Sequence, residues 1–104
     1  MHVVYSLIRY SLSEPSEEWE REVLAFIRAI NCDASLRGRV SYRCLKETDG
    51  VSFCHLAAAV DDMAVEDLKQ KPFFKPYSTR LRAVAKAGPH FTKLQVVGGT
   101  EVQL

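Results

Sequence analysis

Two spacings of hydrophobic residues succeed one another in the first third of this chain. Residues 3–12, VVYSLIRYSL, are rich in β-branched and aromatic residues and predict a strand. Apolar side chains occupy both its odd and its even positions, so we expect both faces of this strand to be covered. Residues 13–31 then change to helical spacing, with Ser13 as the expected cap and Pro15 in the first turn. The predicted helix has one apolar stripe: Trp19, Val23, Phe26, Ile27 and Ile30.

Residues 39–60 predict a β-hairpin. Asp49-Gly50 is a tight-turn signal between two runs of alternating polarity. The alternation places three side chains of the first arm on one face, namely Val40, Tyr42 and Cys44. It places four side chains of the second arm on one face, namely Val51, Phe53, His55 and Ala57.

A helix that breaks at a proline follows the hairpin. Asp61 or Asp62 is expected to cap it, and Pro72 disfavours helix at the residue before it. Helical spacing then resumes at Phe74, Tyr77, Leu81 and Val84. Gly88-Pro89 is the expected stop signal, residues 90–97 the last strand, and residues 98–104 a tail.

The predicted order is β-α-β-β-α-β, which is a ferredoxin-like α+β fold in a single domain, residues 1–104. Right-handed crossovers place both helices on one face of a four-stranded antiparallel sheet. The other face has no cover within the chain, although the first strand is apolar on both sides. We therefore expect a homodimer in which a second copy covers the open sheet face.

Composition excludes several classes of protein. The net charge of +1 and the pI near 7.7 provide no strong field to attract nucleic acid or an anionic membrane. No apolar run approaches the roughly 18 residues of a membrane span, and residues 1–12 lack the pattern of a signal peptide. Three cysteines without metal-ligand spacing predict reduced thiols in a cytoplasmic protein without a metal site.

Three stretches carry a resemblance to a known family: GRVSY (38–42), VSFCHLAAAVDDMAVEDL (51–68) and PFF-x-x-Y (72–77). Together they resemble the antibiotic biosynthesis monooxygenase-like domains of the dimeric α/β-barrel superfamily. The resemblance implies that two protomers pack their sheets into a barrel. It also implies a ligand cavity between sheet and helices, and an oxygenase that needs no cofactor and acts on a small aromatic or quinol-type substrate.

The chain departs from two patterns within that family. Haem-degrading members use an Asn on the first strand and a Trp and a His on or near the second helix. This chain has no Asn on its first strand, its single Trp19 lies on the first predicted helix, and Tyr77 stands at the position of the His. Haem degradation is therefore not expected. Of the Trp, Asn and Tyr that cofactor-free oxygenases of the family use, only the Tyr has a counterpart, again Tyr77.

We expect three residues to be catalytic, namely His55, Tyr77 and Arg9. His55 is a candidate general base near neutral pH. Arg9 is a candidate for orienting an oxyanion or phenolate, as are Tyr10 beside it and Arg43 on the second strand. The alternatives are a hydrogen-bonded core histidine and a solvated strand end.

The expected ligand-binding residues are aromatic. They are Phe73, Phe74, Tyr5 and Tyr42. The segment KPFFKP, residues 71–76, is either a lid over a small apolar ligand or a helix break with Phe74 in the core.

Two other functions remain open. One is a non-catalytic dimeric domain that binds a small ligand. The other is an RNA-recognition module, which has the same element order and a motif similar to DGVSFCHLA. Val51 at an expected aromatic position, the short acidic hairpin loop and the low net charge disfavour RNA.

Overall fold

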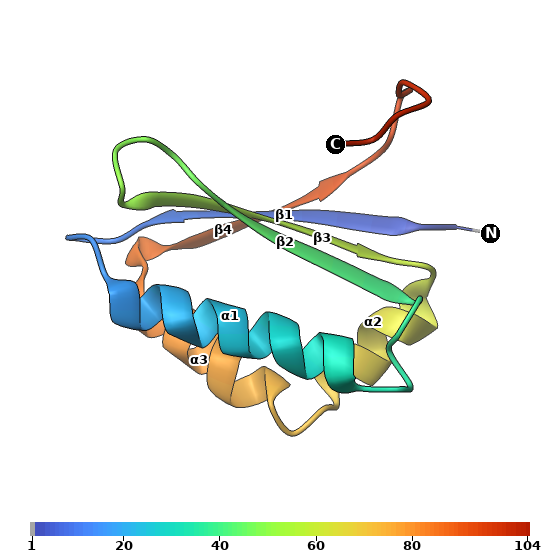
Figure 1. Ribbon diagram of the computed structural model, residues 1–104, viewed down its shortest axis with the longest axis horizontal. Coiled ribbons are helices and arrows are strands. Elements are labelled where there is room, and N and C mark those ends of the chain that lie inside the picture. Colours follow the sequence, from blue (N-terminus) through green and yellow to red (C-terminus); the bar gives the residue numbers. More distant parts are fainter. Residues whose placement is uncertain (1) are drawn as a thin grey trace.

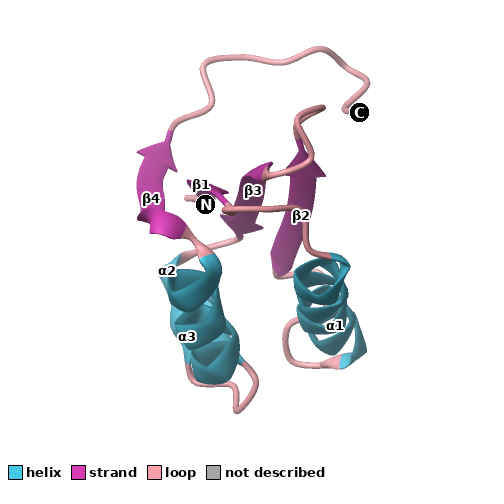
Figure 2. Ribbon diagram, turned by 90° about the vertical axis from the view of Figure 1, so that its left-hand side faces the viewer, coloured by secondary structure: helices cyan, strands magenta, loops and turns pink. Residues whose placement is uncertain are grey.

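The computed structural model describes residues 2–104 and shows one sheet with all helices packed on the same face (Figures 1 and 2). The elements in chain order are β1 (Val4–Ser11), α1 (Glu17–Cys32), β2 (Val40–Lys46), β3 (Ser52–Ala59), α2 (Asp62–Lys69), α3 (Phe74–Val84) and β4 (Lys86–Leu94). The sheet order is β2-β3-β1-β4, and every pairing is antiparallel. The predicted ferredoxin-like fold is confirmed, with the second helical region divided into α2 and α3.

Helix α1 begins at Ser16 rather than at the predicted Ser13. The Ser16 hydroxyl accepts a hydrogen bond from the Trp19 backbone N–H at 3.1 Å, as an N-cap does. The chain before it still follows the sheet, because the Leu12 N–H donates to the Val51 carbonyl at 2.8 Å. This contact with the residue before β3 keeps the chain on the sheet as far as Leu12, so the helix starts further on than a local pattern reveals. The predicted apolar stripe is confirmed, and its Trp19, Val23, Phe26 and Ile30 are buried.

The break at KPFFKP separates α2 from α3. Asp61 caps α2 by accepting from the Ala64 N–H at 2.8 Å. Pro72 lies between the two helices, and Pro76 is the third residue of α3, where no intrahelical N–H bond is needed. Phe73 and Phe74 are partly buried and pack against the core.

The predicted role of Gly88-Pro89 as a helix stop is wrong. Helix α3 already ends at Val84, and β4 begins at Lys86, before this pair and four residues earlier than expected. Gly88 has φ of 79° and lies where the register between β1 and β4 shifts, so the pair forms an irregularity within the strand. Glycine and proline mark β-bulges as well as helix ends, and the sequence pattern does not separate the two.

The two faces of the sheet differ in cover. Ile8, Tyr10 and Phe53 point to the helices and belong to the core. The opposite positions, among them Tyr5 and Arg9, lie on the open face, which no helix covers (Figure 2). The apolar residues of this face and of the chain end include several exposed ones, namely Leu45, Leu94, Val96, Val97, Val102 and Leu104.

Residues 95–104 rise from the end of β4 and turn back above the open face (Figure 1). Arg43 of β2 donates to the Leu104 carbonyl at 2.9 Å, which ties the chain end to the far side of the sheet. No helix within residues 2–104 is both long and apolar enough to cross a membrane.

Replacing Gly50 tests the hairpin turn. Gly50 has φ of 79° and open space around its Cα, so Gly50→Ala adds backbone strain without a clash. We expect the free energy of unfolding to fall by about 1–2 kcal/mol, measured by urea denaturation. Gly98→Ala is the matched control, since Gly98 has equal space and no left-handed backbone, and it should change stability little. Equal effects of the two substitutions would contradict the assigned turn.

Candidate functional site

A buried histidine lies at the centre of the space between sheet and helices. His55 is on β3 and its side chain is fully buried, with 0% of its surface exposed. Its Nε2 lies 2.7 Å from the Tyr10 hydroxyl of β1, and its Nδ1 lies 2.6 Å from the Tyr42 hydroxyl of β2. Both ring nitrogens are therefore engaged by phenols from the neighbouring strands, which a buried polar group requires.

Two more side chains extend these contacts onto the helices. The Trp19 Nε1–H of α1 donates to the Tyr10 oxygen at 2.8 Å. The Tyr77 hydroxyl of α3 lies 3.2 Å from the Tyr42 hydroxyl and 3.3 Å from His55 Nδ1. We call Trp19, Tyr10, His55, Tyr42 and Tyr77 the aromatic network. It joins three strands and two helices through one imidazole.

Aromatic stacking fixes the position of this network. The Tyr10 ring stacks on Phe53 with centroids 5.3 Å apart, and the Tyr77 ring stacks on Phe26 at 3.8 Å. Tyr77 also lies parallel to Trp19, with a centroid distance of 5.7 Å. Such packing leaves the hydroxyl groups little freedom to leave His55.

Burial keeps the network uncharged at neutral pH. It lowers the pKa of His55 to about 4, because the imidazolium loses its hydration. Burial likewise raises the pKa of each of the three tyrosines well above its usual value. His55 is thus neutral at pH 7, and each ring nitrogen is either a donor or an acceptor.

A groove between α1 and α3 reaches the network from outside. It has a volume of about 250 Å³ and is lined by Glu22, Ala25, Phe26, Ala29, Phe73, Pro76, Tyr77 and Arg80. Small side chains on α1 leave this space, and the rings of Phe26 and Tyr77 separate it from His55. At its edge Arg80 donates two hydrogen bonds of 2.8 Å to the Glu22 carboxylate and so links the helices.

The structure brings together some of the predicted site residues and separates others. His55, Tyr42 and Tyr77 meet in the aromatic network. Phe73 lines the groove, and Phe74 packs beside Phe26 with ring centroids 6.3 Å apart. Arg9 and Tyr5 lie on the open face, so within one protomer they do not reach His55. The catalytic and ligand-binding roles of all these residues stay predictions.

Sequence reasoning named Tyr10 only as a candidate for orienting an oxyanion or phenolate, together with Arg9 and Arg43, and did not predict its contact with His55. It assigned Trp19 to the core stripe alone and so missed its hydrogen bond to Tyr10. The signal for Tyr10 was its place on the face of Ile8, because β1 pairs with β3 and sets Tyr10 opposite Phe53, two residues from His55. That register is a tertiary fact. The indole N–H of a fully buried Trp also needs an acceptor.

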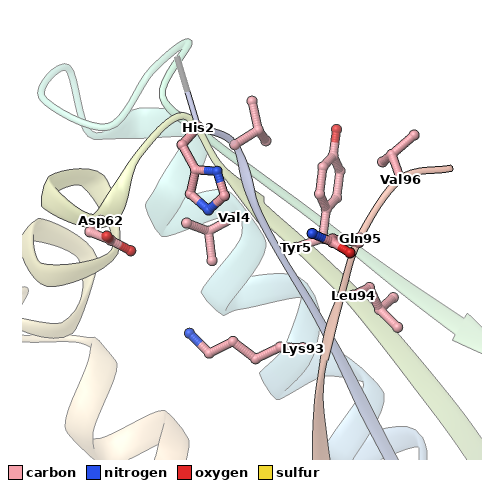
Figure 3. A pocket seen from close by; sticks show the side chains of 9 residues that line it. His2, Val4, Tyr5, Asp62, Lys93, Leu94, Gln95 and Val96 are labelled. Atoms are coloured by element: carbon pink, nitrogen blue, oxygen red, sulfur yellow. The ribbon is translucent and has the colours of Figure 1, made fainter. Parts of the chain in front are cut away.

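A larger hollow of about 840 Å³ lies near the start of β1, at the other end of that strand from Tyr10. His2, Asp62 and Lys93 line its charged side, and Figure 3 shows Tyr5 and Val96 on another wall. His2, Asp62 and Lys93 are exposed. Size alone does not make a site, so we assign no function to this hollow.

Comparisons with known proteins identify the fold. No protein-family model matches the chain, and no curated protein matches it. SnoaB, a cofactor-independent oxygenase from Streptomyces nogalater, matches with a TM-score of 0.77 at 19% identity, covering 98% of this chain and 100% of that one. A candidate antibiotic biosynthesis monooxygenase from Caulobacter crescentus matches with a TM-score of 0.74 at 13% identity, covering 92% and 91%.

A dimeric ferredoxin-like protein of unknown function from a Jannaschia species also matches, with a TM-score of 0.66 at 17% identity over 91% of this chain and 100% of that one. The chain therefore has the ferredoxin-like fold of the antibiotic biosynthesis monooxygenase-like proteins, as its sequence motifs predicted. At these identities the likeness concerns the fold, and the activity is a separate question.

The burial of His55 predicts a loss of stability in mild acid. The unfolded chain binds a proton at His55 near pH 6.5, and the folded protein does so only near pH 4. Between these values the unfolded state binds more protons, so the free energy of unfolding falls as pH falls. We expect a contribution of about 3 kcal/mol, lost between pH 6.5 and 4. Urea denaturation at a series of pH values measures it.

His55→Gln is the control for this pH window, because the glutamine side chain at position 55 does not titrate. Its unfolding free energy should depend less on pH between 6.5 and 4.5. Carboxylates such as Glu22, whose pKa is lowered by its hydrogen bonds with Arg80, add their own loss only below about pH 4.5. Parallel pH profiles of the two proteins would contradict the lowered pKa.

Proposed function

We propose that this protein is a cofactor-independent oxygenase of small phenols or quinols and that the aromatic network is its reaction site. The observation that carries the proposal is the neutral His55 held between the hydroxyl groups of Tyr10 and Tyr42 in a water-excluded interior. Hydrogen-bonding groups fixed in such surroundings interact strongly with charge that develops on a substrate. The shared fold of SnoaB, named as such an oxygenase, supports the reaction type.

The reaction balances without a cofactor when the substrate supplies the electrons. A phenolate gives one electron to O₂, and the resulting radical pair combines to a peroxide at the ring carbon para to the oxygen. Cleavage of the O–O bond then leaves a carbonyl on that carbon, and the ring hydrogen and the phenol proton leave with the second oxygen atom as water. Phenol and O₂ thus give a quinone and water. The protein provides hydrogen bonds to the substrate oxygen and excludes water.

The groove between α1 and α3 supports an aromatic substrate. Phe26, Phe73 and the Tyr77 ring offer flat apolar surfaces, and Tyr77 belongs to both the groove and the network. A substrate ring bound there needs only movement of the Phe26 and Tyr77 rings to approach His55. Phe74 supports this wall from the core side.

We also propose that the working form is a homodimer through the open sheet face, acting in the cytoplasm, where its three free thiols stay reduced. Tyr5, Leu56 and Leu94 line a space of about 580 Å³ between the open face and residues 95–103. A second sheet packed on this face would bury apolar surface that no helix of the same chain covers, and residues 95–104 would lie at its edge or move aside. Tyr5 and Arg9 would then lie at the dimer interface.

A ligand-binding domain without catalysis is the second candidate. The complete burial of His55 and the close Phe26–Tyr77 stacking favour it, because the network is closed in this structure. In that case the network stabilises the fold, and only the groove binds a ligand. Activity measurements separate the two candidates.

Oxygen consumption tests the oxygenase proposal. We expect uptake of O₂ with at least one member of a panel of phenols, quinols and hydroxynaphthalenes, measured with an oxygen electrode on the metal-free protein. His55→Gln and Tyr77→Phe should each lower kcat/KM by about 100-fold, as loss of one hydrogen-bonding group at a developing anion does. Met63→Ala, a substitution at an exposed position of α2, should have no effect. Full turnover in both site variants would contradict the assignment.

Light scattering over a dilution series tests the dimer. We expect twice the monomer mass of 11.7 kDa, and Tyr5→Glu on the open face should shift the protein toward monomer by placing a charge in the interface. Lys75→Glu, on the opposite side of the molecule, is the control. A monomer at all concentrations would contradict the dimer and would favour a test of single-stranded RNA binding.

A further inference from the structure

One of the hydrogen-bonding protons in the aromatic network has no acceptor within the network. Its hydrogen-bonding protons are those of the Trp19 indole, of neutral His55 and of the three phenols. Five contacts join the members, but the three among His55, Tyr42 and Tyr77 form a closed triangle around one nitrogen. When Nδ1 is protonated it cannot accept, so at most two of the three protons in the triangle form hydrogen bonds. One phenolic proton is therefore left without a partner, and its place depends on the tautomer of His55.

Trp19 decides the tautomer through Tyr10. The indole N–H is a donor only, so the Tyr10 oxygen accepts from it at 2.8 Å. The Tyr10 proton then has one acceptor within reach, His55 Nε2 at 2.7 Å. In an Nε2–H tautomer both neighbours of the Tyr10 hydroxyl, the Trp19 indole N–H and the His55 Nε2–H, are donors. The Tyr10 proton would then have no acceptor. Neutral His55 consequently has its proton on Nδ1.

The same reasoning fixes the direction of the remaining bonds. Nδ1–H donates to the closer phenol, Tyr42 at 2.6 Å, rather than to Tyr77 at 3.3 Å. The Tyr42 oxygen is then an acceptor, and its own proton points to the Tyr77 oxygen at 3.2 Å. The unpaired proton is thus on Tyr77, the one member of the network that also lines the groove.

We infer that Trp19 and Tyr10 hold His55 as the Nδ1–H tautomer, so that the hydrogen bonds run in one direction from Trp19 to Tyr77. Tyr77 then offers its free proton to the oxygen of a ligand that enters from the groove as the Phe26 and Tyr77 rings move apart. The ligand class is then a flat aromatic molecule with an acceptor oxygen, either a carbonyl or a phenolate. Trp19 and Tyr10 are positioning residues, and Tyr77 is the residue that contacts the ligand. This inference deepens the proposed function. It makes His55 a donor that supports the substrate anion, and not the base that removes its proton.

Nitrogen NMR of the imidazole tests the tautomer without any substrate. In a tag-free His2→Gln/His90→Gln variant, His55 is the single imidazole, and ¹⁵N-labelled histidine reports which ring nitrogen carries the proton. We expect the Nδ1–H form to exceed the Nε2–H form by about tenfold or more at pH 7. The Nε2–H form leaves the unpaired proton on Tyr10, between two other donors, whereas the Nδ1–H form leaves it on Tyr77, which lines the groove. An excess of the Nε2–H form, or an equal mixture, overturns the inference.

Trp19→Phe tests the positioning role. It removes the indole N–H, so that the Tyr10 proton can point away from His55, and the tautomer ratio should fall by about fivefold or more. Val23→Ala is the matched control, since Val23 is buried on the same stripe of α1 without a polar contact to His55. Loss of packing alone should leave the ratio unchanged. An unchanged tautomer ratio in Trp19→Phe overturns the role of Trp19. If Trp19→Phe does not fold, the tautomer ratio of the protein with an intact network still decides the tautomer.

A pair of ligands of equal shape tests the free proton on Tyr77. Acetophenone and α-methylstyrene have the same shape, but acetophenone has an acceptor oxygen where α-methylstyrene has a methylene group. Binding is followed by the shift of the Trp19 indole N–H signal, which is unique because the chain has one Trp. We expect acetophenone to bind about fivefold more tightly. Tyr77→Phe should remove this preference, whereas Tyr42→Phe, which keeps the Tyr77 hydroxyl, should retain it.

Equal binding of the two ligands, including no measurable binding of either, overturns the assigned ligand class. The result is independent of the oxygenase proposal. A preference for acetophenone without any oxygen consumption supports the inference and contradicts the proposed reaction. Oxygen consumption without the preference supports the reaction and contradicts the inference.

Discussion

The removal of His55 from water is the constraint on which the rest of this structure depends. A fully buried imidazole is tolerated only if both nitrogens have partners, and here Tyr10 and Tyr42 provide them from the strands on either side of β3. The same burial lowers the pKa of His55 to about 4 and keeps the network neutral. A polar cluster thus lies within an apolar core and still meets its hydrogen-bonding requirements.

The network also links the two layers of the fold. Trp19 and Tyr77 belong to the helices, and their polar atoms reach the strands. Their rings stack on each other, and the Tyr77 ring also stacks on Phe26. One substitution in this cluster therefore affects helix packing and hydrogen bonding together. For the same reason, activity alone cannot assign a role to these residues, and the imidazole tautomer provides a readout that loss of packing does not change.

The two sheet faces divide the predicted chemistry. The helix face contains His55, Tyr42 and the groove-lining Tyr77, and the open face contains Tyr5 and Arg9. The alternation of side chains along a strand makes this division unavoidable, since neighbours in the chain point to opposite faces. The proposed reaction site lies on the helix side of the sheet, and the proposed interface between protomers lies on the open side.

The sequence by itself determined the element order, the apolar stripe of α1, the turn at Asp49-Gly50 and the helix break near Pro72, because each depends on contacts between near neighbours in the chain. It also grouped Tyr42 with Val40 and Cys44 on one face of the first hairpin arm, and His55 with Phe53 on one face of the second. The tertiary structure alone decided that Ser16 caps α1 and that Gly88-Pro89 lies within β4. It also joined Tyr10 and Trp19 to His55. The physical reason is register: the pairing of β1 with β3, and the position of α1 across the sheet, arise from long-range packing that no local pattern contains.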